Sequence, residues 1–135
     1  MDKSVFLDTA YILAIIIDND KHHKAVLELS KIISSEHINI VTTELILVEI
    51  ANSLSRLKFR NECIAIIEKL KMNSMVIKID EKRFLSAWTL YKERNDKEWS
   101  LTDCYSFIVM KQFDIKQALT TDKHFEQAGF ERLLK

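Results

Sequence analysis

Glycine and proline are nearly missing from this sequence: Gly129 is the only glycine among 135 residues, and proline is absent. A loop that cradles phosphate groups with its backbone needs several glycines close together, so this class of site is excluded. Any phosphate chemistry in the protein must therefore depend on side chains, a metal ion or helix ends.

Cysteine is also scarce. The two cysteines, Cys63 and Cys104, lack the C-x-x-C spacing of redox and zinc sites, and no short disulfide framework surrounds them. We therefore expect both to be free thiols in the core of a protein from a reducing compartment, here taken to be the cytoplasm.

Neither an excess of charge nor a long apolar run is present. The chain has 20 basic and 20 acidic residues, whereas a domain devoted to holding a polyanion is usually basic. The apolar run at residues 10–17 is shorter than the ~20 residues that cross a bilayer, and it follows Asp8 rather than a basic segment. We expect no membrane anchor and no export signal.

Length and patterning predict one globular domain over residues 1–135. The chain is 47% apolar and 30% charged and contains no linker-like tract, and a domain of this size buries about two thirds of its unfolded surface. Short apolar segments alternate with longer helical ones. Strands are predicted at residues 4–7, 38–41, 75–79, 117–121 and, at an edge, 130–134; helices are predicted at residues 9–17, 22–35, 43–58, 61–72, 81–94, 100–113 and 122–128.

Strands separated by helices predict an α/β fold with three layers, in which helices cover both faces of a mainly parallel sheet of four to five short strands. In such a fold ligands bind outside the carboxyl ends of the strands. Asp8 directly follows the first strand and Asp122 directly follows the fourth. Both should reach that edge of the sheet, although each alone also suits a helix N-cap.

Asp103 has surroundings that make it a candidate for the same site. Ser100 and Asp103 match a capping box, yet Asp103 shares its helix face with Phe107 and Met110, and no lysine or arginine lies within a helical turn. An unpaired ionised carboxylate costs several kcal/mol or more to bury, so such a group is protonated, ion-paired or bound to a cation.

Glu49 is the fourth candidate acid. It lies inside the helix predicted at 43–58, on a polar face with Arg56, and a solvent-exposed ion pair with Arg56 is the simpler interpretation of that face. Glu44, in the first turn, is a rival for any role in the site. Four carboxylates approaching one sheet edge would repel one another without a cation among them, and oxygen ligands suit Mg²⁺ or Mn²⁺.

Four segments, "FLDTAYILAII", "TTELILVEIANSL", "SLTDCYSFIVMKQ" and "LTTDKHFEQAGF", resemble the four acidic motifs of the PIN domain family. The resemblance runs nearly from end to end and implies a PIN-like α/β/α fold. It also implies that Asp8, Asp103 and Asp122 bind metal. Glu49 would complete the site in preference to Glu44, because the glutamate of the family lies deeper in this helix.

The resemblance implies a metal-dependent ribonuclease whose carboxylates hold one or two Mg²⁺ or Mn²⁺ ions, which activate water for in-line attack on a phosphodiester. Small family members are often VapC-type toxins with a cognate antitoxin, and they commonly form homodimers. Hydroxyl residues near the family's metal correspond to Thr9, Ser100 and Thr121, which also suit helix capping.

Basic side chains near the acids predict local contacts with RNA phosphates, despite the neutral net charge. The candidates are Arg56, Lys123 and His124. The aromatic residues Trp88, Trp99 and Tyr105 are assigned to the core or a dimer interface rather than to RNA.

Four other functions are compatible with parts of the pattern. A PIN-fold nuclease in RNA processing, without an antitoxin, would have the same acids, and a non-catalytic binding or dimerisation module would have lost some of them. A haloacid-dehalogenase-type phosphatase also starts with an aspartate after strand one, but it needs a second aspartate where Ala10 stands. A phosphorylated receiver domain lacks its adjacent acid pair here.

Overall fold

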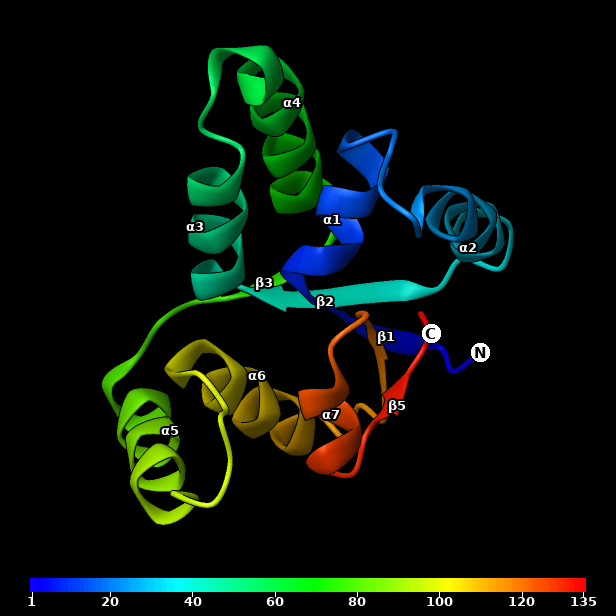
Figure 1. Ribbon diagram of the computed structural model, residues 1–135. Helices are drawn as coiled ribbons and strands as arrows, with labels where there is room; N and C mark the ends of the chain where they lie inside the picture. Colours follow the sequence, from blue (N-terminus) through cyan, green and yellow to red (C-terminus); the bar gives the residue numbers. More distant parts are fainter.

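The computed structural model of residues 1–135 has a central sheet of five parallel strands with helices on both faces (Figure 1). The strands are β1 (Ser4–Leu7), β2 (Asn39–Thr43), β3 (Met75–Ile77), β4 (Gln117–Leu119) and β5 (Glu131–Arg132). The helices are α1 (Thr9–Ile16), α2 (His23–Ser35), α3 (Glu44–Ser53), α4 (Leu57–Asn73), α5 (Glu81–Glu93), α6 (Leu101–Gln112) and α7 (Lys123–Gln127).

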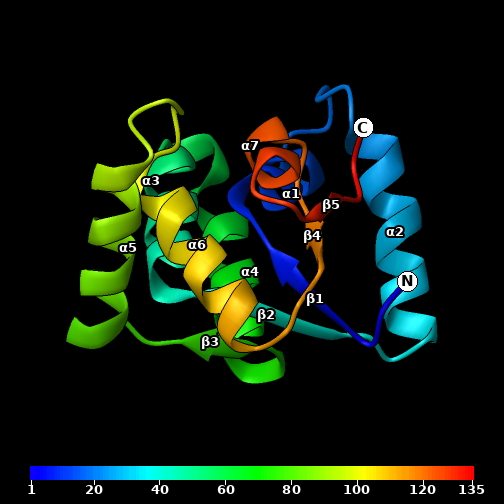
Figure 2. The same cartoon turned by 90° about the horizontal axis from the view of Figure 1, so that it is seen from below.

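The helices form two layers. In Figure 1, α1, α3 and α4 lie above the sheet, and α5, α6 and α7 lie below it. The view from below shows α6 and α7 nearest the viewer, with α5 beside α6 at the left (Figure 2). The predicted three-layer α/β fold is therefore confirmed, and the sheet is parallel throughout.

The strand order β3-β2-β1-β4-β5 puts the first strand in the centre. The chain moves outward from β1 through β2 to β3, then crosses back to place β4 on the other side of β1. Leu7 lies opposite Leu119, and the backbone N–H of Asp8 donates to the Leu119 carbonyl at 3.3 Å. The boundary between β1 and β4 is thus the point where the winding reverses, which is where open α/β sheets bind ligands.

The core consists of one cluster of 28 buried apolar residues. On the lower side of the sheet, Phe107 packs edge-on against both Trp99 and Phe125, with ring centroids 5.0 Å apart in each pair, a favourable geometry for aromatic rings. Cys63 and Cys104 are free and buried, as predicted. Burial, with a further contribution from the nearby Asp103 charge, raises the pKa of the Cys104 thiol to about 11, so this thiol stays neutral.

The main difference from the predicted elements lies between α3 and α4. The sequence predicts one helix over 43–58 and the next from residue 61, but α3 ends at Ser53 and α4 begins at Leu57. In the turn between them, the Arg60 guanidinium donates to the Ser55 carbonyl, at 3.1 Å from Nε. The buried Leu54 continues the apolar periodicity of α3 through this turn, so the pattern gives no sign of the break.

Three strands are shorter than predicted, and a fourth begins and ends later; among the shorter ones, β5 covers Glu131–Arg132 instead of residues 130–134. β3 ends at Ile77 instead of residue 79, and β4 ends at Leu119 instead of residue 121. β2 runs to Thr43, whose side chain caps α3 by accepting the N–H of Ile46 at 3.2 Å. The predicted edge strand forms as β5, parallel to β4. None of the seven helices combines the length and the apolar character that a membrane crossing requires.

Candidate metal centre

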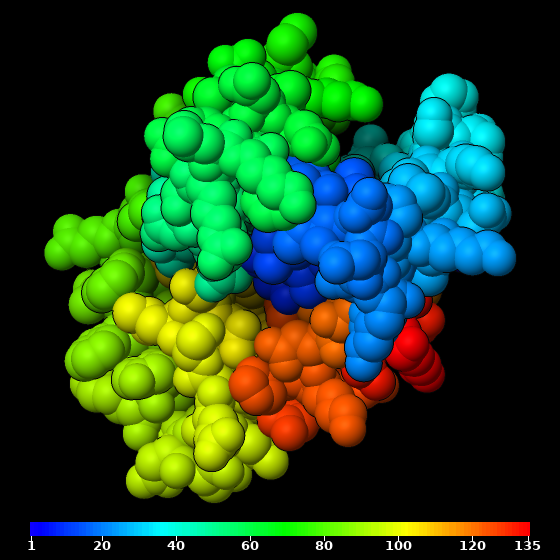
Figure 3. Space-filling view, turned by 45° about the horizontal axis from the view of Figure 1, so that its top comes forward, coloured from blue at the N-terminus to red at the C-terminus, as the bar shows by residue number.

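Four elements bring acidic side chains to the β1/β4 boundary. Asp8 follows β1 and Asp122 follows β4, while Glu49 lies in α3 above the sheet and Asp103 lies in the first turn of α6 below it. The segments that carry them, blue, orange, green and yellow, meet on one face of the molecule in the space-filling view (Figure 3). The structure therefore brings all four predicted acids together.

Asp8 is the most buried of these acids, with 7% of its surface exposed. The pKa of Asp8 is raised to about 7: burial is the main cause, the charges of Asp103 and Glu49 contribute, and hydrogen bonds from the Thr120 side chain and the Thr9 backbone oppose the rise. No lysine or arginine forms an ion pair with Asp8. Ionised Asp8 is thus a desolvated carboxylate without a fixed counter-charge.

Thr120 connects two of the acids. Its fully buried hydroxyl donates to Asp8 Oδ2 at 2.6 Å and accepts the backbone N–H of Asp122 at 3.0 Å. The resemblance to the PIN family pointed instead to Thr121, the residue directly before Asp122. The carbonyl of Thr121 accepts a hydrogen bond from Arg132 Nη1 at 2.7 Å. The hydroxyl beside Asp8 is that of Thr120.

The two glutamates of α3 have different partners. The Thr9 hydroxyl donates to the Glu49 carboxylate, which places Glu49 beside the residue that follows Asp8. Glu44 instead accepts the backbone N–H of Ile79 at 2.7 Å, in the segment that follows β3. Of the two rivals, Glu49 is therefore the one whose charge acts on Asp8.

Asp103 both caps a helix and lies in the acidic cluster, the two roles that the sequence suggested for it. It forms a capping box with Ser100: the Ser100 hydroxyl accepts the Asp103 N–H at 3.0 Å, and the Ser100 N–H donates to Asp103 Oδ2 at 3.2 Å. The same Oδ2 lies 2.9 Å from Nδ1 of His124, and the Asp103 side chain is 13% exposed. The cap holds the carboxylate still at the positive end of the α6 dipole.

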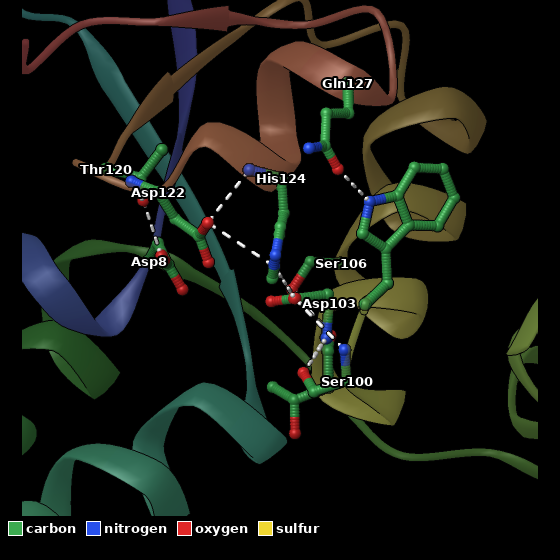
Figure 4. Close-up of polar contacts among 10 residues, drawn as sticks. Asp8, Ser100, Asp103, Ser106, Thr120, Asp122, His124 and Gln127 are labelled. Carbon is green, nitrogen blue, oxygen red and sulfur yellow. Dashed lines mark hydrogen bonds and ion pairs between the residues drawn. The ribbon is translucent and has the colours of Figure 1, made fainter. Parts of the chain in front are cut away.

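His124 lies between Asp103 and Asp122, as the close-up shows (Figure 4). Its Nδ1 is 3.4 Å from Asp122 Oδ1, and its backbone N–H donates to that oxygen at 2.9 Å. Asp103, Asp122 and His124 each offer one ligand atom within 4.8 Å of the others. Carboxylate oxygen and imidazole nitrogen both bind divalent metals, so these residues fit a cation.

Comparison with known proteins identifies the architecture that carries these acids. The sequence matches the PIN domain family over residues 5–131. The chain belongs to this family. Comparison with curated proteins finds no match.

Solved structures share this PIN fold. VapC20 of Mycobacterium tuberculosis, described as a sarcin-ricin loop cleaving toxin, has a TM-score of 0.82 at 23% identity, covering 93% of this chain and 95% of that one. VapBC2 from Rickettsia felis, solved with a promoter DNA fragment, has a TM-score of 0.70 at 13% identity, covering 96% of each chain. VapBC-1 from nontypeable Haemophilus influenzae has a TM-score of 0.63 at 14% identity, covering 96% of each.

The basic residues of this PIN domain are less concentrated at the acids than the sequence suggested. The alternative ion pair between Glu49 and Arg56 does not form, because α3 ends at Ser53 and exposed Arg56 precedes α4. Lys123 is exposed on α7, whereas His124 lies among the acids themselves. Of the aromatic residues, Trp99 and Tyr105 are buried, as predicted, and Trp88 stacks on Tyr91 with ring centroids 5.6 Å apart.

Proposed function

We propose that this PIN domain is a metal-dependent endoribonuclease that hydrolyses RNA phosphodiester bonds at its acidic centre. The observation that carries the proposal is the convergence of four carboxylates at the β1/β4 boundary without a lysine or arginine to neutralise them. Membership of the PIN family supports a nuclease.

The donor set fits Mg²⁺ or Mn²⁺. Asp8, Asp103 and Asp122 would hold the ion, and their oxygens are the ligand type that both metals accept. The raised pKa of Asp8 favours the same conclusion, since a carboxylate that burial makes costly to ionise is stabilised by a cation next to it. A divalent ion held there would polarise the scissile phosphate and lower the pKa of a bound water.

The remaining residues of the centre would fix the geometry of these ligands. Thr120 orients Asp8 through its hydroxyl, and the Ser100 cap restrains Asp103. Glu49 would complete the acidic site, oriented by the hydroxyl of Thr9. Groups that hold a ligand carboxylate in one orientation strengthen metal binding because less freedom is lost when the ion binds.

Exposed basic side chains would hold the RNA. Lys123 follows Asp122 directly, and Arg56 is exposed at the start of α4. We propose that both contact phosphate groups, which would position the RNA without reading its sequence.

A toxin of a toxin–antitoxin pair, assembled as a homodimer in the cytoplasm, is the biological role we propose. The VapC20 toxin and the VapBC assemblies are similar to nearly the full length of this chain, and that similarity supports an antitoxin as partner.

The test is cleavage of structured and unstructured RNA by the purified protein with Mg²⁺, with Mn²⁺ or with EDTA. We expect cleavage with either metal and none with EDTA. Asp8→Asn should lose more than roughly 100-fold in rate, because even outer-shell partners of a metal are worth 10–100-fold. The matched control is Asp18→Asn, which changes an exposed aspartate outside the centre. Metal-independent cleavage, or full activity of Asp8→Asn, would contradict the proposal.

A further inference from the structure

His124 is the only imidazole among the acids of the metal centre. Of the four histidines in the chain, it alone belongs to a group of side chains whose ligand atoms lie close enough to share an ion. Its ring is partly covered, with 29% of the side chain exposed. Its backbone N–H donates to Asp122 Oδ1, and its ring Nδ1 lies 2.9 Å from Asp103 Oδ2.

We propose that His124 Nδ1 is a direct ligand of the divalent ion, and that this nitrogen makes the centre prefer Mn²⁺ over Mg²⁺ more strongly than carboxylates alone would. The inference rests on the proposed function, because it takes Asp103 and Asp122 as ligands of that ion. It adds a donor of a different chemical type from the four acids.

The spacing of the donor atoms supports direct ligation. In an octahedral site with bonds of about 2.1 Å, neighbouring ligand atoms lie roughly 3 Å apart. Nδ1 of His124 is 2.9 Å from Asp103 Oδ2 and 3.4 Å from Asp122 Oδ1. Nδ1 therefore lies at the separation of an adjacent ligand from each carboxylate oxygen, and all three atoms lie within 4.8 Å of one another.

The nitrogen would change the metal preference because Mg²⁺ and Mn²⁺ respond differently to donor type. Mg²⁺ binds oxygen ligands and keeps several waters, so an imidazole adds little to its affinity. Transition metals accept imidazole nitrogen as well as carboxylate oxygen, and their affinity for mixed nitrogen and oxygen sites is higher. Removing the ring should therefore weaken Mn²⁺ binding more than Mg²⁺ binding.

A simple ion pair between His124 and the two aspartates would give the same distances without metal. The two arrangements differ in one observable property, which is whether a histidine nitrogen is bonded to the ion. Pulsed electron paramagnetic resonance of Mn²⁺ detects this nitrogen directly through its coupling to the electron spin, and it does not depend on RNA cleavage.

The experiment compares the full chain with His124→Gln and with His22→Gln as the matched control. His22 Nδ1 lies 3.6 Å from Asp20, so the control also removes a histidine next to an aspartate, but outside the centre. We expect nitrogen coupling to bound Mn²⁺ in the wild type and in His22→Gln, and none in His124→Gln. Calorimetric titrations should show the ratio of the Mg²⁺ and Mn²⁺ dissociation constants falling by about tenfold in His124→Gln alone.

Oxygen-only coordination of Mn²⁺ in the wild type would overturn the inference, as would an unchanged metal ratio in His124→Gln. If His124→Gln does not fold, wild-type protein labelled with ¹⁵N-histidine still decides the question, because a bonded imidazole replaces the ¹⁴N signal by a ¹⁵N signal. A wild type that binds neither ion would contradict the proposed function as well. A wild type that binds Mn²⁺ through oxygen alone would contradict only the role of His124.

Discussion

The helices α5 and α6 pack against each other, and an aspartate lies at the start of each in different company. Asp80 caps α5 by accepting the Arg83 N–H at 2.7 Å, and its second oxygen forms an ion pair with the Arg83 guanidinium. Asp103 caps α6 together with Ser100, but its carboxylate faces His124 and the other acids rather than a lysine or an arginine. The first carboxylate is neutralised within its own helix, and the second is not.

The difference separates a carboxylate that is neutralised within its own helix from one that we propose binds a cation. Arg83 also donates to Gln112 Oε1 at 2.8 Å, so the Asp80 carboxylate and the Arg83 guanidinium are both paired with groups of the protein itself. At the start of α6, Asp103 adds its negative charge to that of Asp8, whose pKa is already raised by burial. A helix cap alone does not require this accumulation of charge, whereas a cation site does.

Substituting the two aspartates by asparagine should separate their roles most strongly. Asp103→Asn would remove a proposed metal ligand, and we expect RNA cleavage to fall by more than roughly 100-fold. Asp80→Asn should leave the cleavage rate unchanged and lower the free energy of unfolding by less than about 1 kcal/mol, because asparagine still caps a helix and only a partly exposed ion pair is lost. Initial cleavage rates and urea unfolding measure both effects. Equal losses of activity would contradict the distinction.

Thr120→Val should have the next largest effect. The change removes the hydroxyl that donates to Asp8 and accepts from the Asp122 N–H. We expect a loss of about 10–100-fold in metal affinity or in cleavage rate, the usual cost of losing a group that orients a ligand. Thr121→Val is the matched control, since no side-chain hydrogen bond of Thr121 is present. If calorimetry shows the wild-type metal affinity in Thr120→Val as well as in Thr121→Val, Thr120 does not orient a metal ligand.

The stability of the metal-free protein should depend on the protonation of Asp8. In the unfolded chain this carboxyl titrates near its ordinary value of 3.8, and in the folded protein its pKa is about 7. Below pH 3.8 both states are protonated and there is no penalty. As the pH rises toward 7, only the unfolded state loses its proton readily, so the folded protein becomes less stable; above about 7 the penalty is complete.

Asp8→Asn removes this penalty and should stabilise the metal-free protein by up to about 4 kcal/mol at pH 8, with little change at pH 4. Urea unfolding in EDTA at both pH values measures the difference. The control variant Asp18→Asn should match the wild type at each pH. If Asp8→Asn destabilises the metal-free protein at pH 8, Asp8 is not an unpaired buried charge.

The smallest expected effect concerns positive charge next to the centre. Lys123→Ala should weaken RNA binding about equally for all sequences and reduce the dependence of the logarithm of affinity on the logarithm of salt concentration by about one. Lys24→Ala, on the exposed face of α2, serves as the control. Binding isotherms over a range of salt concentrations test this, using Asp8→Asn protein so that the RNA is not cleaved. An unchanged salt dependence would remove Lys123 from the RNA-binding surface.

Most of the fold could be predicted from the sequence because its signals are local. Short apolar strands such as residues 4–7, separated by helices, require crossovers and therefore a parallel sheet. The break between α3 and α4 could not be predicted, since buried Leu54 continues the helical periodicity and no glycine or proline marks the turn. Resemblance to the PIN family identified the acids that converge, including Glu49 over Glu44, because each of their motifs is contiguous in sequence.

Two parts of the centre could not be predicted, because they depend on where the chain turns after β4. The resemblance selected Thr121, the residue before Asp122, but β4 ends at Leu119 and the chain then turns so that the hydroxyl of Thr120 reaches Asp8. His124 contacts Asp122 through its backbone N–H and Asp103 through its ring, and Asp103 is 21 residues away in sequence. Such contacts follow from tertiary structure rather than from any periodic pattern.

The most direct test of the cation-site interpretation is an anomalous diffraction map from crystals grown with saturating Mn²⁺, recorded where manganese scatters anomalously. We predict a peak within bonding distance of Asp8, Asp103 or Asp122 carboxylate oxygens, and no peak beside the neutralised Asp80. An empty acidic centre at saturating Mn²⁺, or a peak beside Asp80 alone, would contradict the conclusion that these unneutralised carboxylates form a metal site.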